Sequence, residues 1–160
     1  MFLWMRLLFH MGANLSISWG KQGKMMTDWT DATAPDSDEI EAIARRVLDT
    51  LPAAFAPHAK DIVLRVEDFA DDAMMDELEI DDPLELTGIY DGVPMTEKSP
   101  SFPQHFPDTI WLFRRAIIDE WAERGDVTLA DLVIHVTVHE LAHHFGWSDD
   151  DIAKIDRWWE

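Results

Sequence analysis

The chain has 160 residues, enough for one hydrophobic core but not for two. It contains no cysteine, which excludes disulfide bonds and thiolate metal sites and fits a reducing cytoplasm. The formal net charge of -19 argues against nucleic acid and anionic membranes as partners. Such an acidic chain is typical of a highly soluble protein, and a cationic substrate is the less common alternative.

The first 27 residues differ from the rest of the chain. No acidic residue occurs between Met1 and Met26, whereas the remainder is strongly acidic. The apolar run near the start is interrupted by Arg6 and is too short to span a bilayer. We therefore predict an N-terminal extension over 1–27, or a true start at Met25 or Met26, followed by a single domain over 28–160. The predicted location is cytoplasmic; a secreted protein is the alternative if the extension acts as a signal peptide.

The domain is predicted to begin with an amphipathic helix. Asp36 and Glu39 provide a cap and an acidic first turn, and Pro52 ends the helix. The residues between them repeat at the three-four spacing of one buried stripe: Ile40, Ile43, Ala44, Val47, Leu48 and Leu51.

The middle of the chain alternates strand signals with acidic stretches. Residues 61–66 are short and β-branched, which predicts a strand. Residues 67–91 contain eleven acids and no lysine or arginine, with room for one or two helical turns around Met74 to Leu78. The acid pairs there lack the spacing of a calcium loop, so a solvated face is the favoured interpretation. Residues 84–90 are predicted to form a strand that enters a turn, and 95–108 a proline-containing loop.

The last third of the chain is predicted to hold one strand and two helices, followed by a short terminal turn. Residues 109–117 give the strongest strand signal, and 117–124 a short helix that stops at Gly125. Thr128 is placed to cap a helix that runs to Phe145. Beyond Asp149, Ile152 and its neighbours have the spacing of one helical turn packed on the core.

The helix expected after Thr128 carries a metal-binding pattern. His139 and His143 lie one turn apart, about 6 Å along the axis, so both imidazoles can reach one cation. Glu140 lies beside them, close enough to contact a water held by that cation. Gly146 is placed to end the helix, which lets the chain turn back and offer Asp149 as a third ligand. Two imidazoles, one carboxylate and an open position indicate a catalytic zinc site rather than a structural one.

The alternative interpretation is a solvated polar helix face. The neighbouring sequence opposes it, because this helix is apolar on nearly every side and must therefore be buried. Burying two histidines and a glutamate without partners would cost several kcal/mol. A bound metal removes that cost.

The other histidines and polar residues lie outside the ligand pattern. His135 and His143 start about 12 Å apart along a helix, too far to share one ion, so His135 is predicted to be a core or supporting residue. His144 points away from the ligand pair and is predicted to be structural. Tyr90, His135 and the Arg114-Arg115 pair are the open candidates for a donor to a developing oxyanion. Segment 109–117 is our prediction for an exposed sheet edge that binds substrate.

The pattern His139-Glu140-x-x-His143-x-x-Gly146-x-x-Asp149 resembles that of the small bacterial minimal-zincin metallopeptidases. The resemblance extends from about Asp36 to Ile155 and includes segments 88–94 and 110–114. It implies a compact α+β minimal zincin, with a few-stranded mixed sheet packed on two or three helices, one of which carries the two histidines. It further implies one Zn2+ held by His139, His143 and Asp149, with Glu140 as the base.

The sequence departs from the larger metzincins in two respects. Asp149 stands where they have a third histidine, and no methionine follows Met95 to form a methionine turn.

Two functions therefore remain open at the level of sequence. The favoured one is a zinc-dependent metallopeptidase, a hydrolase acting on a peptide or protein substrate. The alternative is a metal-stabilised binding or regulatory module without turnover. Neither calls for nucleic acid or a membrane, and both are compatible with a monomer.

Overall fold

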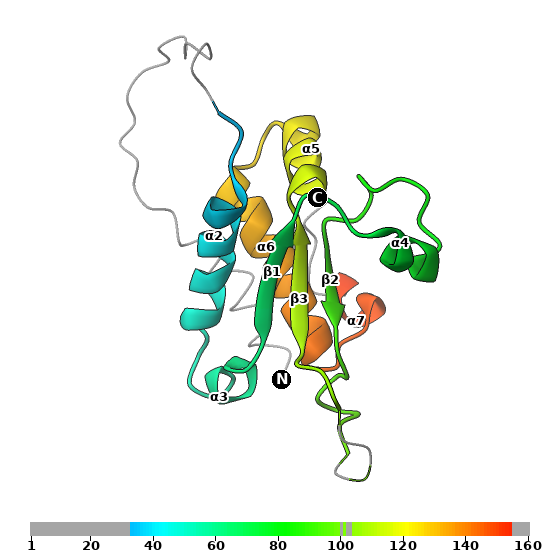
Figure 1. Ribbon diagram of the computed structural model, residues 1–160. Coiled ribbons are helices and arrows are strands. Elements are labelled where there is room, and N and C mark those ends of the chain that lie inside the picture. The colour runs from blue at the N-terminus through cyan, green and yellow to red at the C-terminus, as the bar shows by residue number, and fades with distance from the viewer. Residues whose placement is uncertain (1–32, 100, 102–103, 155–160) are drawn as a thin grey trace.

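The structure, a computed structural model, describes residues 33–99, 101 and 104–154 of the chain. The predicted extension over 1–27 lies outside the described residues. Helices and strands follow one another in a mixed order (Figure 1): α2 (Ser37–Asp49), α3 (Ala56–Ala59), β1 (Val63–Glu67), α4 (Asp72–Leu78), β2 (Gly88–Asp91), β3 (Thr109–Phe113), α5 (Arg114–Arg124), α6 (Leu129–His144) and α7 (Asp149–Ala153). None of the helices in these ranges has both the length and the apolar character needed to cross a membrane.

The three strands form one mixed sheet in the order β1-β3-β2. β1 runs parallel to β3 and pairs Leu64 with Ile110, whereas β2 runs antiparallel and pairs Tyr90 with Ile110. β3 is therefore the central strand, and four of its five residues are buried. The prediction that segment 109–117 forms an exposed edge is wrong, because strands pair with both sides of β3. Among the described strands, β1 and β2 are the edges.

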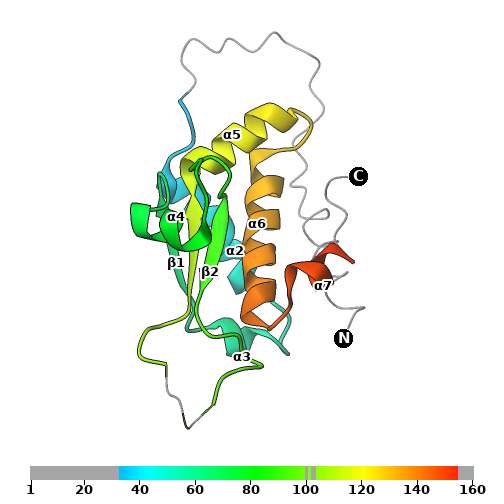
Figure 2. The ribbon, with the colours of Figure 1, turned by 90° about the vertical axis from the view of Figure 1, so that its right-hand side faces the viewer.

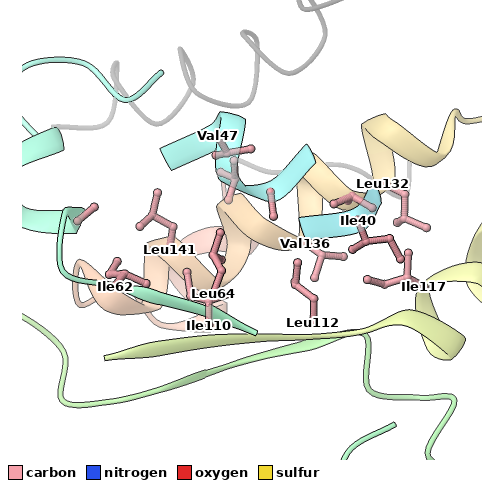
Figure 3. Packing of buried hydrophobic residues seen from close by; sticks show 14 of the residues in the cluster. Ile40, Val47, Ile62, Leu64, Ile110, Leu112, Ile117, Leu132, Val136 and Leu141 are labelled. Carbon is pink, nitrogen blue, oxygen red and sulfur yellow. The ribbon is translucent and has the colours of Figure 1, made fainter. Parts of the chain in front are cut away.

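The core lies between the sheet and two helices, α2 and α6, that cover one of its faces (Figures 2 and 3). Val47 of α2 and Leu141 of α6 lie over Leu64 of β1 and Ile110 of β3, whereas Ile40 of α2 lies beside Leu132 of α6 and Ile117 of α5. Full burial of one such side chain contributes about 1.5–3 kcal/mol. Helices packed on one face of a mixed sheet make this an α+β fold, as the family resemblance implied.

The two long helices begin where their capping residues predict. Asp36 accepts a hydrogen bond from the N–H of Glu39, whose carboxylate accepts one from the N–H of Asp36, so α2 starts with a capping box. Thr128 accepts from the N–H of Asp131 at 3.1 Å and starts α6. These local signals were sufficient because each cap involves residues three apart in sequence.

The junction between β3 and α5 differs from the prediction. The strand ends at Phe113 and the helix begins at Arg114, so residues 114–117 are helical rather than extended. Two long-range contacts fix this point: the N–H of Arg115 donates to the carbonyl of Asp68, and the guanidinium of Arg114 bonds to the Asp68 carboxylate at 2.7 Å. β2 is likewise shorter than the predicted 84–90 and starts only at Gly88.

Candidate metal centre

Helix α6 places its polar residues in two rows. His139 and His143 are four residues apart and form one row, and Glu140 and His144 form the next row around the helix. The first row is partly accessible, with 30% and 24% of the histidine side chains exposed. The second row is buried, Glu140 at 7% and His144 at 1% exposed. The helix therefore presents the two imidazoles toward solvent and the carboxyl toward the interior.

The turn after α6 requires glycine. Gly146 has φ +87°, and its N–H donates to the carbonyl of His143 at 2.9 Å. A Cβ on this residue would lie 2.3 Å from Oγ1 of Thr96. The chain then reverses, Ser148 caps α7 by accepting from the N–H of Asp151, and buried Ile152 packs with Ala142 of α6 in a small cluster apart from the main core. This return path puts Asp149, the first residue of α7, beside the histidine row.

The structure brings the three predicted ligands together. Oδ1 of Asp149 lies 3.2 Å from Nε2 of His139 and 3.3 Å from Nε2 of His143, and the two Nε2 atoms are 3.2 Å apart. Zinc bonds of about 2.0–2.1 Å at tetrahedral angles require ligand atoms separated by about 3.3–3.4 Å. The three atoms therefore fit a single zinc ion, with Glu140 adjacent in sequence to one ligand.

The hydrogen bond at the far side of His143 prepares its ring for a cation. Nδ1 of His143 lies 2.9 Å from the carbonyl oxygen of Trp147. A carbonyl oxygen only accepts, so Nδ1 donates, and in the neutral ring the lone pair is on Nε2, toward Asp149. Burial, followed by the proximity of His143, lowers the pKa of His139. The lowered pKa favours the neutral imidazole of His139, which is the form that binds metal.

Glu140 lies against strand β2. Burial raises the pKa of Glu140 to about 8, an effect opposed by a hydrogen bond from the backbone N–H of Tyr90 and reinforced by the charge of Asp149. The close approach of the strand depends on Gly88, where a Cβ would come within 2.7 Å of Val136 Cγ1 and 3.3 Å of Glu140 Cγ. The carboxyl is thus held between the metal-binding row and the edge strand of the sheet.

The structure distinguishes the candidates for an oxyanion donor by their contacts. Arg114 and Arg115 both pair with Asp68, and the Tyr90 hydroxyl is bonded to Oδ1 of Asp108 at 2.8 Å. The His135 ring lies close to one ligand, with its centroid 6.4 Å from that of His139. Burial, the neighbouring His139 and Arg124 lower the pKa of His135 to about 3, so its ring is neutral. His135 thus borders the site without joining the ligand triangle.

His144 is structural, as predicted, and its partners were not foreseen. Its Nε2 donates to the carbonyl of His58 at 3.0 Å, and its Nδ1 lies 3.3 Å from the Tyr90 hydroxyl and 3.5 Å from Oδ2 of Asp108. Asp108 in turn accepts from Lys98 and Gln104. No sequence pattern marks the contacts of His144 with Tyr90 and His58, because they span 54 and 86 residues.

Comparison with known proteins identifies a family for this chain. A family model described as zincin-like metallopeptidase matches residues 59–159, which include all three strands, α6 and the three candidate ligands. A search of curated proteins found no match. Zinc is the ion this family implies, and the two imidazoles and one carboxylate at these separations suit it. On the match and the fold together, the chain belongs to the zincin-like metallopeptidase family.

Proposed function

We propose that the protein is a zinc-dependent metallopeptidase that hydrolyses peptide bonds, with His139, His143 and Asp149 as the zinc ligands. The observation that carries the proposal is the triangle of ligand atoms, 3.2–3.3 Å on each side, next to a buried carboxyl. Zinc, when bound there, lowers the pKa of a water and polarises the scissile carbonyl. The other steps belong to residues of this chain.

Glu140 is the proposed general base. Its carboxyl takes a proton from the attacking water and passes it to the leaving nitrogen, so one group serves both transfers. Burial supports this role, because it brings the pKa of Glu140 from 4.5 to about 8, into the range where a carboxylate both accepts and releases a proton. A cation on the neighbouring triangle favours the ionised, proton-accepting form.

The proposed substrate is an extended peptide that adds a strand to β2. One side of β2 pairs with β3, and no strand of the described chain pairs with the other side. The backbone N–H of Tyr90 places this strand beside Glu140. A peptide hydrogen-bonded along the free edge would therefore run past the reacting groups.

The charge around β2 favours a basic peptide. α4 lies on one side of β2 and α6 on the other (Figure 2). Residues 71–91, which contain α4 and β2, have nine acids and no lysine or arginine. In the part of the chain that the structure describes, none of these nine carboxylates forms an ion pair. The electrostatic field of unpaired carboxylates attracts cationic ligands and raises their concentration near the surface.

A mixed-sequence peptide library incubated with zinc-loaded protein tests the proposal. The native protein should cleave peptides of the library. Glu140→Gln should bind zinc equally well but cleave at least about 100-fold more slowly, because a general base contributes at least about that factor to the rate. Cleaved peptides should be enriched in lysine and arginine.

The alternative, a metal-stabilised binding or regulatory module, predicts a different result. In that case zinc-loaded native protein leaves the library intact, because a structural ion needs no general base. Equal cleavage by native and Glu140→Gln proteins would instead point to a contaminating peptidase and refute the role of Glu140.

A further inference from the structure

Tyr90 contacts two residues of α6 that lie one turn apart. Its backbone N–H bonds to the carboxyl of Glu140, and its hydroxyl lies 3.3 Å from Nδ1 of His144. Glu140 and His144 form the buried row beside the His139–His143 row. A single residue of β2 therefore meets α6 at both ends of the turn that carries the proposed ligands.

The hydroxyl of Tyr90 is itself fixed by Asp108. The hydroxyl donates to Oδ1 of Asp108 at 2.8 Å and also lies 3.0 Å from the carbonyl oxygen of Val93. Gln104 and Lys98 also donate to the Asp108 carboxylate, which is only 10% exposed. Burial opposes ionisation, but the hydrogen bonds from Lys98, Tyr90 and Gln104 outweigh it and lower the pKa of Asp108. Asp108 is thus a charged acceptor, and bonds to charged acceptors are about twice as strong as neutral ones.

The surroundings leave the hydroxyl little freedom. A Cβ on Gly92 would lie 2.5 Å from the Tyr90 oxygen and 2.4 Å from Oδ1 of Asp108, so the chain passes directly over this bond. The end of α6 is tied to the same region, because the carbonyl of His144 accepts from the N–H of Met95 at 2.9 Å. These contacts join β2, the segment after it and the last turn of α6.

We propose that Tyr90 is a positioning residue of the metal centre, whose hydroxyl, held by Asp108, sets how the last turns of α6 lie on β2. The inference rests on the proposed function, since it assigns Tyr90 to the same site. Any rotation of α6 that moves His144 also moves His143, because both belong to one turn. Ligand triangles with sides of 3.2–3.3 Å tolerate little rotation before one donor leaves the ion.

The variant Tyr90→Phe keeps the ring and the backbone N–H but removes the hydroxyl. We expect its zinc affinity, measured by competition with a chelator, to fall about 10-fold or more, the usual effect of removing a group that orients a ligand. The absorption bands of bound Co2+ should shift as well, because they report ligand geometry. A residue that only stabilises the fold would lower the melting temperature and leave both readouts unchanged.

Thr137→Val is the matched control. It also removes one buried hydroxyl, whose 2.7 Å hydrogen bond goes to Val133 within α6 and not to β2. It should lower the melting temperature while zinc affinity and the Co2+ spectrum match those of the native protein. If folded Tyr90→Phe behaves in the same way, the positioning role is refuted.

Two further outcomes are decisive. Should Tyr90→Phe fail to fold, Asp108→Asn disturbs the same connection with no change in size, and native affinity and spectrum in that variant would overturn the proposal. Because neither readout depends on turnover, failure of this inference is separate from failure of the peptidase proposal. Native protein that binds neither Zn2+ nor Co2+ would overturn both.

Discussion

Helices α6 and α4 lie on opposite sides of β2 and are packed in opposite ways (Figure 2). α6 buries nine of its sixteen residues, including the charged or polar Glu140 and His144, whereas no residue of α4 is buried. α4 instead exposes acids and the apolar side chain of Leu78. Glu140 and the two histidine ligands thus sit on a helix with many buried residues, whereas α4, beside the proposed substrate edge, supplies charge and little packing.

The largest contrast is expected from leucine truncation in the two helices. Leu141→Ala in α6 removes a side chain that is 1% exposed and should lower the free energy of unfolding by about 2–5 kcal/mol. Leu78→Ala in α4, where the side chain is 38% exposed, should change it by at most about 0.5 kcal/mol. Urea denaturation measures both, and equal losses would contradict the comparison.

Carboxylates of the two regions should also differ in their effect on metal binding. Asp149→Ala removes one of three ligand atoms and should weaken zinc binding by at least about 100-fold. Removing a residue that only orients a ligand weakens binding by up to about 100-fold, so losing the ligand itself should cost at least that much. Asp76→Ala in α4 removes an equal charge away from the triangle and should leave zinc affinity within about 2-fold. Zinc content unchanged in Asp149→Ala after dialysis against a chelator would refute the ligand assignment.

Glu140 should make the metal-free protein less stable as the pH rises from about 6.5 to about 8, whereas below that range the lowered pKa values of His135, His139 and His144 act in the opposite direction. The pKa of Glu140 is raised from 4.5 to about 8 in the folded state, so the folded protein binds a proton that the unfolded chain has released. One such group contributes at most about 1.4 kcal/mol per pH unit. Glu140→Gln should flatten the dependence, measured by urea denaturation in chelator, and parallel native and variant curves would contradict this account.

The smallest effect is expected from the acids of α4. Neutralising Asp76 and Glu77 by Asp76→Asn and Glu77→Gln should lower the kcat/KM for a basic peptide by a few-fold at low salt and less at high salt. The matched pair Asp119→Asn and Glu123→Gln removes two exposed charges from α5. An equal change in both double variants would show that net charge, rather than the position of α4, sets the preference.

Sequence alone predicted the features that depend on near neighbours. Each of these features acts within about one helical turn, so the spacing in sequence determines the geometry. They are the two histidine ligands, Gly146 and the capping residues Asp36 and Thr128. The approach of Asp149 also followed, because a glycine turn limits where the next three residues can go.

The rest of the site depends on contacts between distant segments. Which strands form the edges is decided by pairing across the sheet: the prediction chose segment 109–117 as an exposed edge, whereas the structure has β1 and β2 at the edges. The Tyr90–Asp108 bond spans 18 residues and the Tyr90–His144 contact 54. No spacing rule links such residues, since their proximity exists only once the sheet and α6 have packed.

The central claim is that one divalent ion is held by His139, His143 and Asp149. Anomalous diffraction at the zinc edge from zinc-soaked crystals tests it most directly. We predict one peak about 2.0–2.2 Å from Nε2 of both histidines and from a carboxylate oxygen of Asp149. No peak at this position, or a peak that lacks any one of the three ligands, would contradict the claim.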